Sequence, residues 1–243
     1  MKLFYLSLIV IPFFISCSDT STTKEPGFMS SKISDSMPFN SNNPFEVAGQ
    51  LHNTLYESYY SADSLEEDIS SISNRVTQLA NQNIVFMSWA GSSFPVISKD
   101  KIDYILSNSS VSQTEIIESS LIAPSSKSSF SDFIDSVVLL CDTEDDYFVI
   151  YDFIVTYEES ILSNTTLSAY DKKIILTTTS IARHSAYERK KRPKKNRDPE
   201  WDLMVGNIVA GIDGASDSLE KAVLMSLITG ISENDLDVKN KNQ

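Results

Sequence analysis

Apolar residues recur every three or four positions along most of this chain, which is the spacing of one face of an α-helix. The first such segment starts near Asn43 and continues to about Tyr60. Asn43 is a suitable N-cap, and Pro44 suits the first helical turn. The apolar positions that define the face are Phe45, Ala48, Leu51, Leu55 and Tyr59. We therefore predict a helix over about 44–60.

A second, longer helix is predicted next. Asp63 and Glu66 have the spacing of a capping box, in which two side chains satisfy free backbone N–H groups. A narrow apolar seam follows, and Asn83 is its one polar interruption. The seam residues are Leu65, Ile69, Ile72, Val76, Leu79 and Phe86. Gly91 and Pro95 then prevent the helix from continuing.

Shorter helices are predicted in the middle of the chain. One covers 101–107, and a second opens at a Ser112–Glu115 capping box. A third has its apolar face at Phe130, Phe133, Ile134, Val137 and Cys141. The acids of 142–146 favour another helix start, because carboxylates are stabilised at the positive end of a helix dipole.

The last long helix of this series opens at a Ser168–Asp171 capping box and continues beyond Ile181. Asn-Gly hairpin signals are missing, and the one Asp-Gly pair lies inside a helical pattern. The sequence therefore predicts an all-α fold, a multi-helix bundle forming one domain over 43–236.

Small residues mark the C-terminal part of this domain. Helices are predicted within 199–231, followed by a polar tail at 237–243. Gly206, Ala210 and Gly214 repeat every four residues, which lets another backbone approach closely. We expect this face to pack against another helix, in the same domain in preference to a second copy of the chain.

The N-terminus has the pattern of an export signal. Lys2 precedes an apolar run from Leu3 to Ile15, and the small residue Ser16 stands directly before Cys17. The run is too short to span a bilayer. We expect 1–16 to be a signal peptide and 17–42, rich in polar residues, to be a flexible tether. An ordinary secretory signal with an incidental Cys17 is the alternative.

The Ser16–Cys17 junction resembles the lipobox of bacterial lipoproteins. That resemblance implies that Cys17 receives a diacylglycerol and that membrane lipid is the first partner of the protein. Ser18 differs from the Asp that retains enterobacterial lipoproteins at the inner membrane. The expected location is therefore the cell envelope, with the outer membrane favoured and its face left open.

Charge narrows the choice of partners. The chain has 20 Lys and Arg against 33 Asp and Glu, a formal net charge of −13, which argues against nucleic acid. The exception is a basic loop at 189–198. Its cations are an anion-binding candidate for lipid phosphates, acidic glycan or an acidic protein, or else a solvated helix end. They are Arg189, Lys190, Lys191, Arg192, Lys194, Lys195 and Arg197.

Catalytic and metal motifs are scarce. His52 and His184 are the only histidines, and neither has the ligand spacing of a metal site. We expect His52 to bond a polar neighbour in the core. Neighbouring helical residues diverge, so His184 and Ser185 do not form a nucleophile–base pair. Cys141 is expected to be a buried apolar residue. No metal or cofactor is predicted.

Scattered motifs resemble a group of uncharacterised Bacteroidota lipoproteins. His52-Asn53-Thr-Leu55 resembles an "HN..L" first helix, and 180–187, Ser-Ile-Ala-Arg-His-Ser-Ala-Tyr, is similar to a Ser-x-x-His/Arg-Ser-x-x-Tyr helix. Trp201 and the glycine zipper from Gly206 to Gly214 follow in the same order. The resemblance implies a small envelope lipoprotein and carries over no catalytic residue.

Two functions remain open at this point. The preferred one is a lipid-anchored helical binding or structural module. The alternative is an envelope hydrolase with an acid among Glu158, Glu159 and Asp171, although the pair Glu158–Glu159 is expected to be solvated. An enzyme predicts buried carboxylates or a histidine in a concave pocket, whereas a binding module predicts the same groups exposed or satisfied in the core.

Overall fold

The computed structural model describes residues 37–62, 66, 68–91, 94–190 and 205–241. Over these ranges the chain forms ten helices and no strand, so the all-α prediction is confirmed. The signal peptide, Cys17, residues 18–36 of the tether and most of the basic loop lie outside the described residues. None of the helices described is both long enough and apolar enough to cross a membrane.

The helices follow one another with short connections. In chain order they are α2 (Glu46–Tyr60), α3 (Ile69–Gln82), α4 (Ile84–Ala90), α5 (Lys99–Ser107), α6 (Ser109–Ser119), α7 (Pro124–Thr143), α8 (Tyr147–Ser163), α9 (Ala169–Lys190), α10 (Val205–Asp217) and α11 (Leu219–Lys241).

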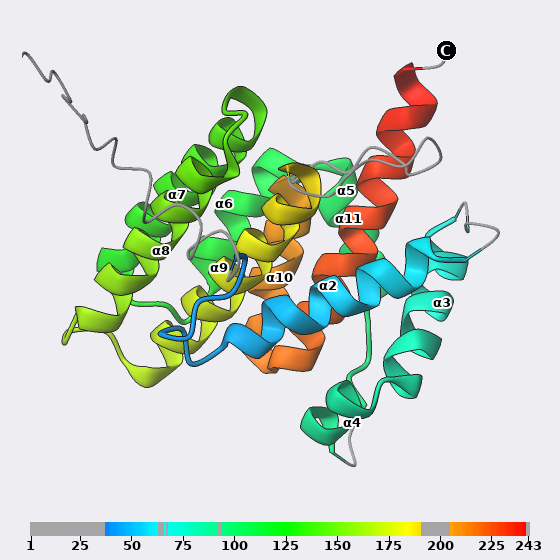
Figure 1. Cartoon of the computed structure of the whole chain (residues 1–243), viewed down its shortest axis with the longest axis horizontal. Coiled ribbons are helices and arrows are strands. Elements are labelled where there is room, and N and C mark those ends of the chain that lie inside the picture. The colour runs from blue at the N-terminus through cyan, green and yellow to red at the C-terminus, as the bar shows by residue number, and fades with distance from the viewer. Residues whose placement is uncertain (1–36, 63–65, 67, 92–93, 191–204, 242–243) are drawn as a thin grey trace, which may run out of the picture.

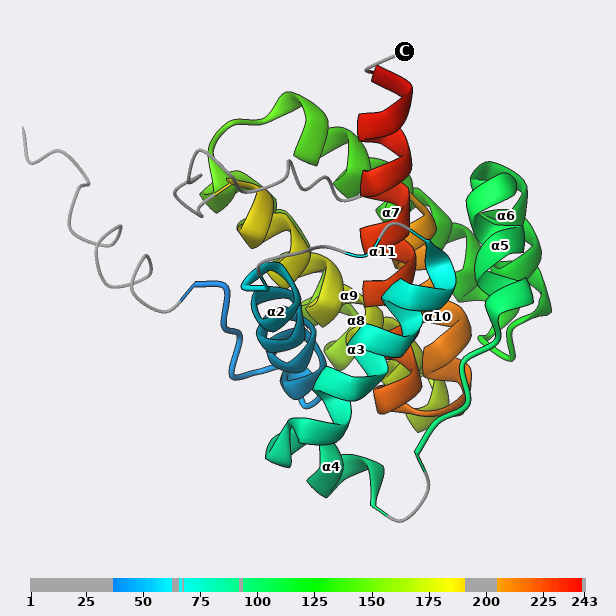
Figure 2. The same cartoon turned by 90° about the vertical axis from the view of Figure 1, so that its right-hand side faces the viewer.

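Three C-terminal helices make the centre of the bundle. α9 lies between α2 and α8 and also contacts α10, and α10 packs along α11 (Figures 1 and 2). Every residue from Ile174 to Ala186 is buried, polar ones included. α7 and α8 flank this centre on one side and α2 and α3 on the other, while α4 projects from one end of the molecule.

Two of the predicted helix starts are wrong. α3 begins at Ile69, where Asp68 accepts hydrogen bonds from the Ser70 and Ser71 N–H groups at 2.9 and 3.1 Å. Ser112 lies inside α6 and is buried, so the Ser112–Glu115 pair is not a helix start. A serine and an acid three residues apart also occur within helices, and in those positions the spacing carries no capping role.

The long second helix is in fact two. The Asn83 side chain accepts a hydrogen bond from the Phe86 N–H at 2.9 Å and so caps a new helix, α4. The polar interruption of the seam is therefore a boundary. By contrast, the Ser168–Asp171 box forms as predicted, with Ser168 Oγ donating to Asp171 at 2.7 Å and accepting from its N–H at 3.1 Å.

The ends of the domain also differ from the prediction. The last residues of the predicted tether, from Met37, lie against the helical body, and Asn40 is buried. At the other end α11 continues to Lys241, so most of the predicted polar tail is helical.

Candidate functional site

The most unusual feature of the core is a fully buried arginine. Arg183, on α9, has no exposed surface. Its guanidinium donates to the carboxylate of Glu46 on α2, to Glu158 on α8 at 3.4 Å, and to the backbone carbonyl of Pro38. The Tyr151 ring lies 6.0 Å from the guanidinium carbon. A buried charge is tolerated only when it is paired and hydrogen-bonded, and Arg183 has both forms of support.

Glu158 ties the N-terminal segment to the same place. Asn40 and Asn43 donate to its two carboxylate oxygens at 2.6 and 2.8 Å, and Thr179 donates at 2.9 Å. The Asn43 amide also donates to the Leu176 carbonyl at 3.0 Å. Asn43 is therefore occupied by tertiary contacts, and α2 begins at Glu46, slightly later than predicted. We call these residues the ion network: Asn40, Asn43, Glu46, Glu158, Arg183 and His184.

His184 completes the ion network on the side of α2. Its Nε2 lies 2.7 Å from Glu46 Oε1, and because an ionised carboxylate only accepts, Nε2 is assigned the proton. Gly49 makes the approach possible, since a side chain there would meet the imidazole ring and the Ser180 carbonyl. Ser180 Oγ accepts from the Gly49 N–H and donates to the Glu46 carbonyl, both at 3.1 Å.

Burial and pairing compete at each charged group of the ion network. Burial acts to raise the pKa of Glu46, but hydrogen bonds from His184 and Arg183 outweigh it and bring that pKa below its ordinary value. Burial lowers the pKa of His184 despite the Glu46 contact. At neutral pH the pair is therefore a carboxylate and a neutral imidazole.

A groove of about 410 Å³ opens beside His184. It lies between α2 and the start of α4, and its lining includes Pro38, Val47, Leu51, Asn53 and Val85. His184 Nδ1 is buried and has no hydrogen-bond partner among the described residues. Nδ1 is therefore a buried acceptor without a partner, in a side chain that also lines the groove.

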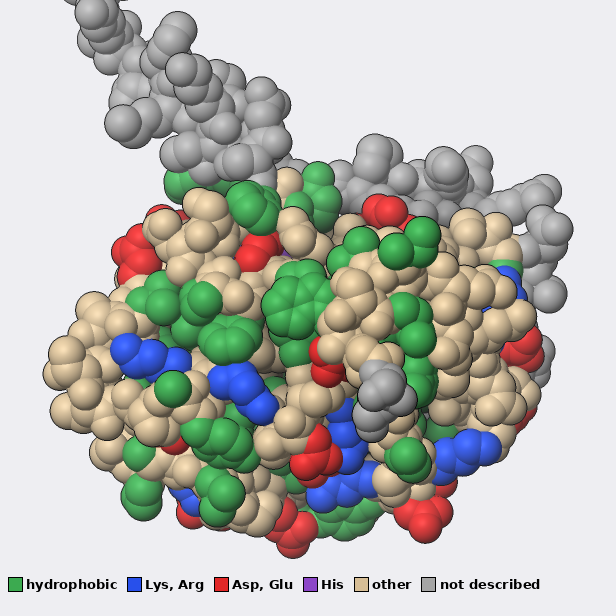
Figure 3. Space-filling view, turned by 90° about the horizontal axis from the view of Figure 1, so that it is seen from below, with side chains coloured by type: hydrophobic (Ala, Val, Ile, Leu, Met, Phe, Trp, Pro, Cys, Tyr) green, Lys and Arg blue, Asp and Glu red, His purple; other side chains and the backbone are tan. Residues whose placement is uncertain are grey.

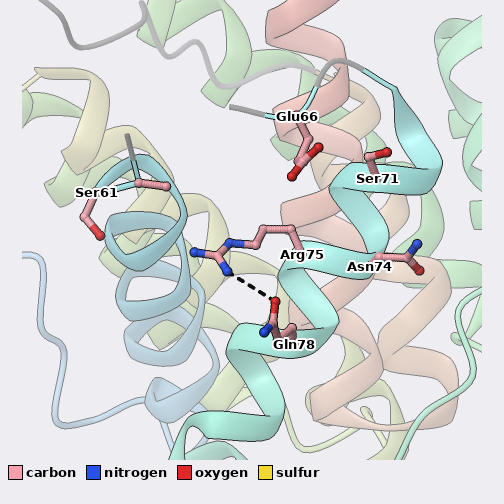
Figure 4. Close-up of a pocket in the computed structure, with 7 residues that line it drawn as sticks. Ser61, Glu66, Ser71, Asn74, Arg75 and Gln78 are labelled. Carbon is pink, nitrogen blue, oxygen red and sulfur yellow. Dashed lines mark hydrogen bonds between the residues drawn. The ribbon is translucent and has the colours of Figure 1, made fainter. Parts of the chain in front are cut away.

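A larger cavity, of about 680 Å³, has a different character. It lies between the end of α2 and the exposed side of α3, and Arg75 donates to Gln78 at 3.2 Å within it (Figure 4). The other labelled groups are serine, asparagine and glutamate side chains. It brings together no buried acid or histidine, so we assign it no chemistry.

Metal binding finds no support in the described ranges. No group of three or more His, Cys, Asp or Glu side chains is arranged to hold an ion there. His52 is buried on α2, where burial and the neighbouring His184 lower its pKa to about 3. Cys141 is fully buried in the core.

The predicted anion-binding residues are only partly described. Arg189 and Lys190 form the end of α9, and the other five lie outside the described residues. Arg189 Nη1 donates to Asp142 at 2.9 Å. Arg189, the predicted cation for which the structure describes an ion pair, is therefore already paired with an acid of the same chain.

The small-residue face lies inside the molecule. The Gly214 Cα faces the backbone of α11, and a Cβ built there would be 2.6 Å from Ala222 Cα. A side chain at Gly206 would meet the carboxylate of Glu233. Ala210 is fully buried. These contacts are within the chain, so in the described structure the face is not available to a second copy.

The three acids of the hydrolase alternative do not meet. Glu158 is fully buried in the ion network, so the expectation that it is solvated is wrong, because three amide and hydroxyl donors and Arg183 replace water around it. Glu159 is exposed. Asp171 caps α9 and accepts from the Ala123 N–H at 2.9 Å. Eight residues of α9, a rise of about 12 Å, separate it from the Glu158 partner Thr179.

Sequence reasoning missed Glu46, Asn40, Arg183 and the role of His184. The one available signal was local: the adjacent Arg183 and His184 lie in a helix where neighbouring positions are apolar or small. Their acidic partner is 137 positions away, at the start of α2. A single sequence does not link positions so far apart.

No protein-family model, curated protein or solved structure matches this chain.

Proposed function

We propose that this protein is a lipid-anchored protein of the bacterial cell envelope whose helical body is a binding or structural module. Acylated Cys17 holds it at the membrane, the following residues provide reach, and the ion network fastens the end of the tether to the body. The motif resemblance to small Bacteroidota lipoproteins supports the same class of protein.

The observation that carries the proposal is how the buried charges are used. Arg183 pairs with both Glu46 and Glu158, Pro38 accepts a further hydrogen bond from Arg183, and Asn40 and Asn43 donate to Glu158. A catalytic acid must reach its substrate. Glu158 instead bonds Asn40 and Asn43, in the chain segment that leads back to the predicted lipid anchor, which is the use expected of a mechanical attachment.

The anchor is tested by growing cells that express the full chain with an alkyne-bearing fatty acid. We expect the wild-type chain to incorporate the label at a mature N-terminus that begins at residue 17, and the Cys17→Ala chain to incorporate none. Mass spectrometry of the N-terminal peptide identifies the modified residue. A wild-type chain that starts elsewhere and carries no acyl group would overturn the anchor.

One observation favours a second candidate, an envelope hydrolase. The Glu46–His184 pair has the arrangement of an oriented general base, with Nδ1 unpartnered and the His184 side chain among those that line the groove. A panel of ester and glycan substrates tests it. Turnover that disappears in His184→Gln, with the helical circular dichroism spectrum retained, would favour the enzyme; the binding-module proposal expects no turnover.

A further inference from the structure

α4, which projects from one end of the bundle, carries several exposed apolar side chains. α4 and the segment that returns from it, 94–97, form a small protrusion, which we call the apolar tip (Figures 1 and 2). Ile84 is 86% exposed, Val96 84%, Val85 52% and Trp89 50%. Large apolar side chains so close together on a surface mark an interaction site.

The apolar tip has a defined local structure. Asn83 caps α4, and Gly91 ends it at a φ of 60°, a backbone conformation that favours glycine. Phe86 is fully buried and its ring lies 5.6 Å from that of Phe94, so the outgoing and returning segments are held together. The exposed residues are therefore presented outward from a fixed support.

The scarcity of charged residues around the apolar tip indicates which kind of surface it binds. No acidic or basic residue occurs between Arg75 and Lys99, in a chain of which 22% is charged. Figure 3 views the molecule from the end where α4 projects; hydrophobic side chains reach the surface at many points there, with Lys, Arg, Asp and Glu side chains between them. A protein partner is usually matched by a polar rim of charges. An uncharged tip with an exposed tryptophan suits the interface of a bilayer, where indole rings concentrate.

The point where the tether joins the body also supports a membrane as the partner of the apolar tip. Pro38, next to the described end of the tether, and Val85 of the tip line the same groove. The tether thus joins the body on the side of α4. From Cys17 to Met37 the chain spans at most about 70 Å when fully extended, so the tether holds its point of attachment on the body within that distance of the bilayer.

We propose that the apolar tip inserts into the interfacial layer of the membrane that holds the lipid anchor, orienting the body on that membrane. The proposal rests on the acylated Cys17 of the proposed function. Its contacts are apolar and come from Ile84, Val85, Trp89 and Val96, so its predicted partner is a zwitterionic lipid surface and not an anionic headgroup.

The test uses the acylated full chain in phosphatidylcholine vesicles. Trp201→Phe leaves Trp89 as the single tryptophan, and its emission is compared between plain lipids and lipids brominated near the headgroup end of the acyl chain. We expect bromine to remove most of the Trp89 emission. If Trp201→Phe unfolds the chain, the difference between wild type and Trp89→Phe gives the same information.

A matched variant separates the tip from the anchor. Ile84→Ser with Val96→Ser changes two largely exposed side chains, so the helical spectrum and vesicle flotation should be retained while bromine quenching of Trp89 falls severalfold. Chains that float with vesicles but show equal Trp89 emission in both lipids would overturn the tip and leave the anchor standing. Trp89 shielded from acrylamide without bromine quenching would mean that a protein covers the tip, which also overturns the proposal. Chains that fail to float would overturn tip and anchor together.

Discussion

Two helix contacts near the centre of this molecule differ in what holds them together. Where α2 meets α9, Gly49 allows a close approach and a charged cluster lies beside it, with Arg183 between Glu46 and Glu158 of α8. Where α10 meets α11, the close approach is at Gly214, against the Ala222 backbone, and no buried charge pair lies beside it among the described residues. The first contact is specific because each partner needs the others. The second is specific because nothing larger fits.

The two contacts should therefore fail in different ways. Removing one member of a buried charge group leaves the others unpaired in a medium that does not solvate them. Adding one methyl group to a close backbone contact forces the two helices apart. A substitution that removes a charge at similar volume tests the first contact, and one that adds volume without charge tests the second.

The largest effect is expected at Arg183. Arg183→Met keeps most of the side-chain volume but leaves two buried carboxylates without their cation, and should lower the free energy of unfolding by about 3–5 kcal/mol. Urea denaturation followed by circular dichroism measures it. The control is Arg189→Met, whose partner Asp142 is largely exposed, so the loss should be about 0–1 kcal/mol. Equal losses in the two variants would contradict the role assigned to the ion network.

A smaller effect is expected at Gly214. Gly214→Ala places a methyl group 2.6 Å from Ala222 Cα and should cost about 1–3 kcal/mol, although alanine favours helix. Gly211→Ala is the matched control, because its Cβ would lie 3.6 Å from Ser226 Cβ, an ordinary contact. That variant should gain up to about 1 kcal/mol from helix propensity. Thermal melts at two protein concentrations show whether association contributes; effects of the same sign would argue against a close contact at Gly214.

An effect of similar size concerns pH and the start of α10. Glu233 of α11 accepts from the Gly206 and Asn207 N–H groups at 3.1 and 3.0 Å, yet burial raises its pKa to about 7 from an ordinary value of 4.5. A raised carboxyl pKa means that the folded state holds its proton longer than the unfolded state. The contribution of Glu233 to stability therefore falls as pH rises from about 4.5 to 7.

Glu233→Gln should remove this pH dependence. Relative to wild type, its free energy of unfolding should rise by about 1–3 kcal/mol between pH 4.5 and 8. The variant must be compared with wild type at each pH, because His52 and His184 titrate in both proteins. Their lowered pKa values destabilise the fold as pH falls below about 6.5, which is opposite to the effect of Glu233. A difference that shrinks as pH rises would show that the carboxylate is favoured by its two N–H donors.

The contrast between the ion network and the small-residue face also explains which features could be predicted from the sequence. The spacing of Gly206, Ala210 and Gly214 lies within one helix, so a local pattern suffices to single it out. The helices over 124–143 and 147–163 were likewise predictable, because their apolar faces recur every three or four residues. The ion network was not, because Glu46 and Arg183 lie 137 positions apart and no pattern within either segment links them.

Helix starts show the limit of local chemistry. The Ser168–Asp171 pair forms a capping box, whereas the similar Ser112–Glu115 pair lies inside a helix with Ser112 buried. The difference is tertiary, since Asp171 also accepts from Ala123 of a distant loop. Asn83 shows the converse: one polar residue in an apolar seam ends one helix and caps the next.

Hydrogen exchange of the segment 40–46 tests the central claim most directly, namely that the ion network fastens the end of the tether to the helical body. The Asn42, Asn43, Phe45 and Glu46 N–H groups donate to oxygens of Asn40 or Asn43, whose side chains are held by Glu158. Glu158→Gln offers one carbonyl oxygen in place of two carboxylate oxygens, so one asparagine loses its acceptor. We predict that these amides lose protection in the full-length variant, while those of α10 and α11 keep theirs. Unchanged protection of the segment would contradict the account.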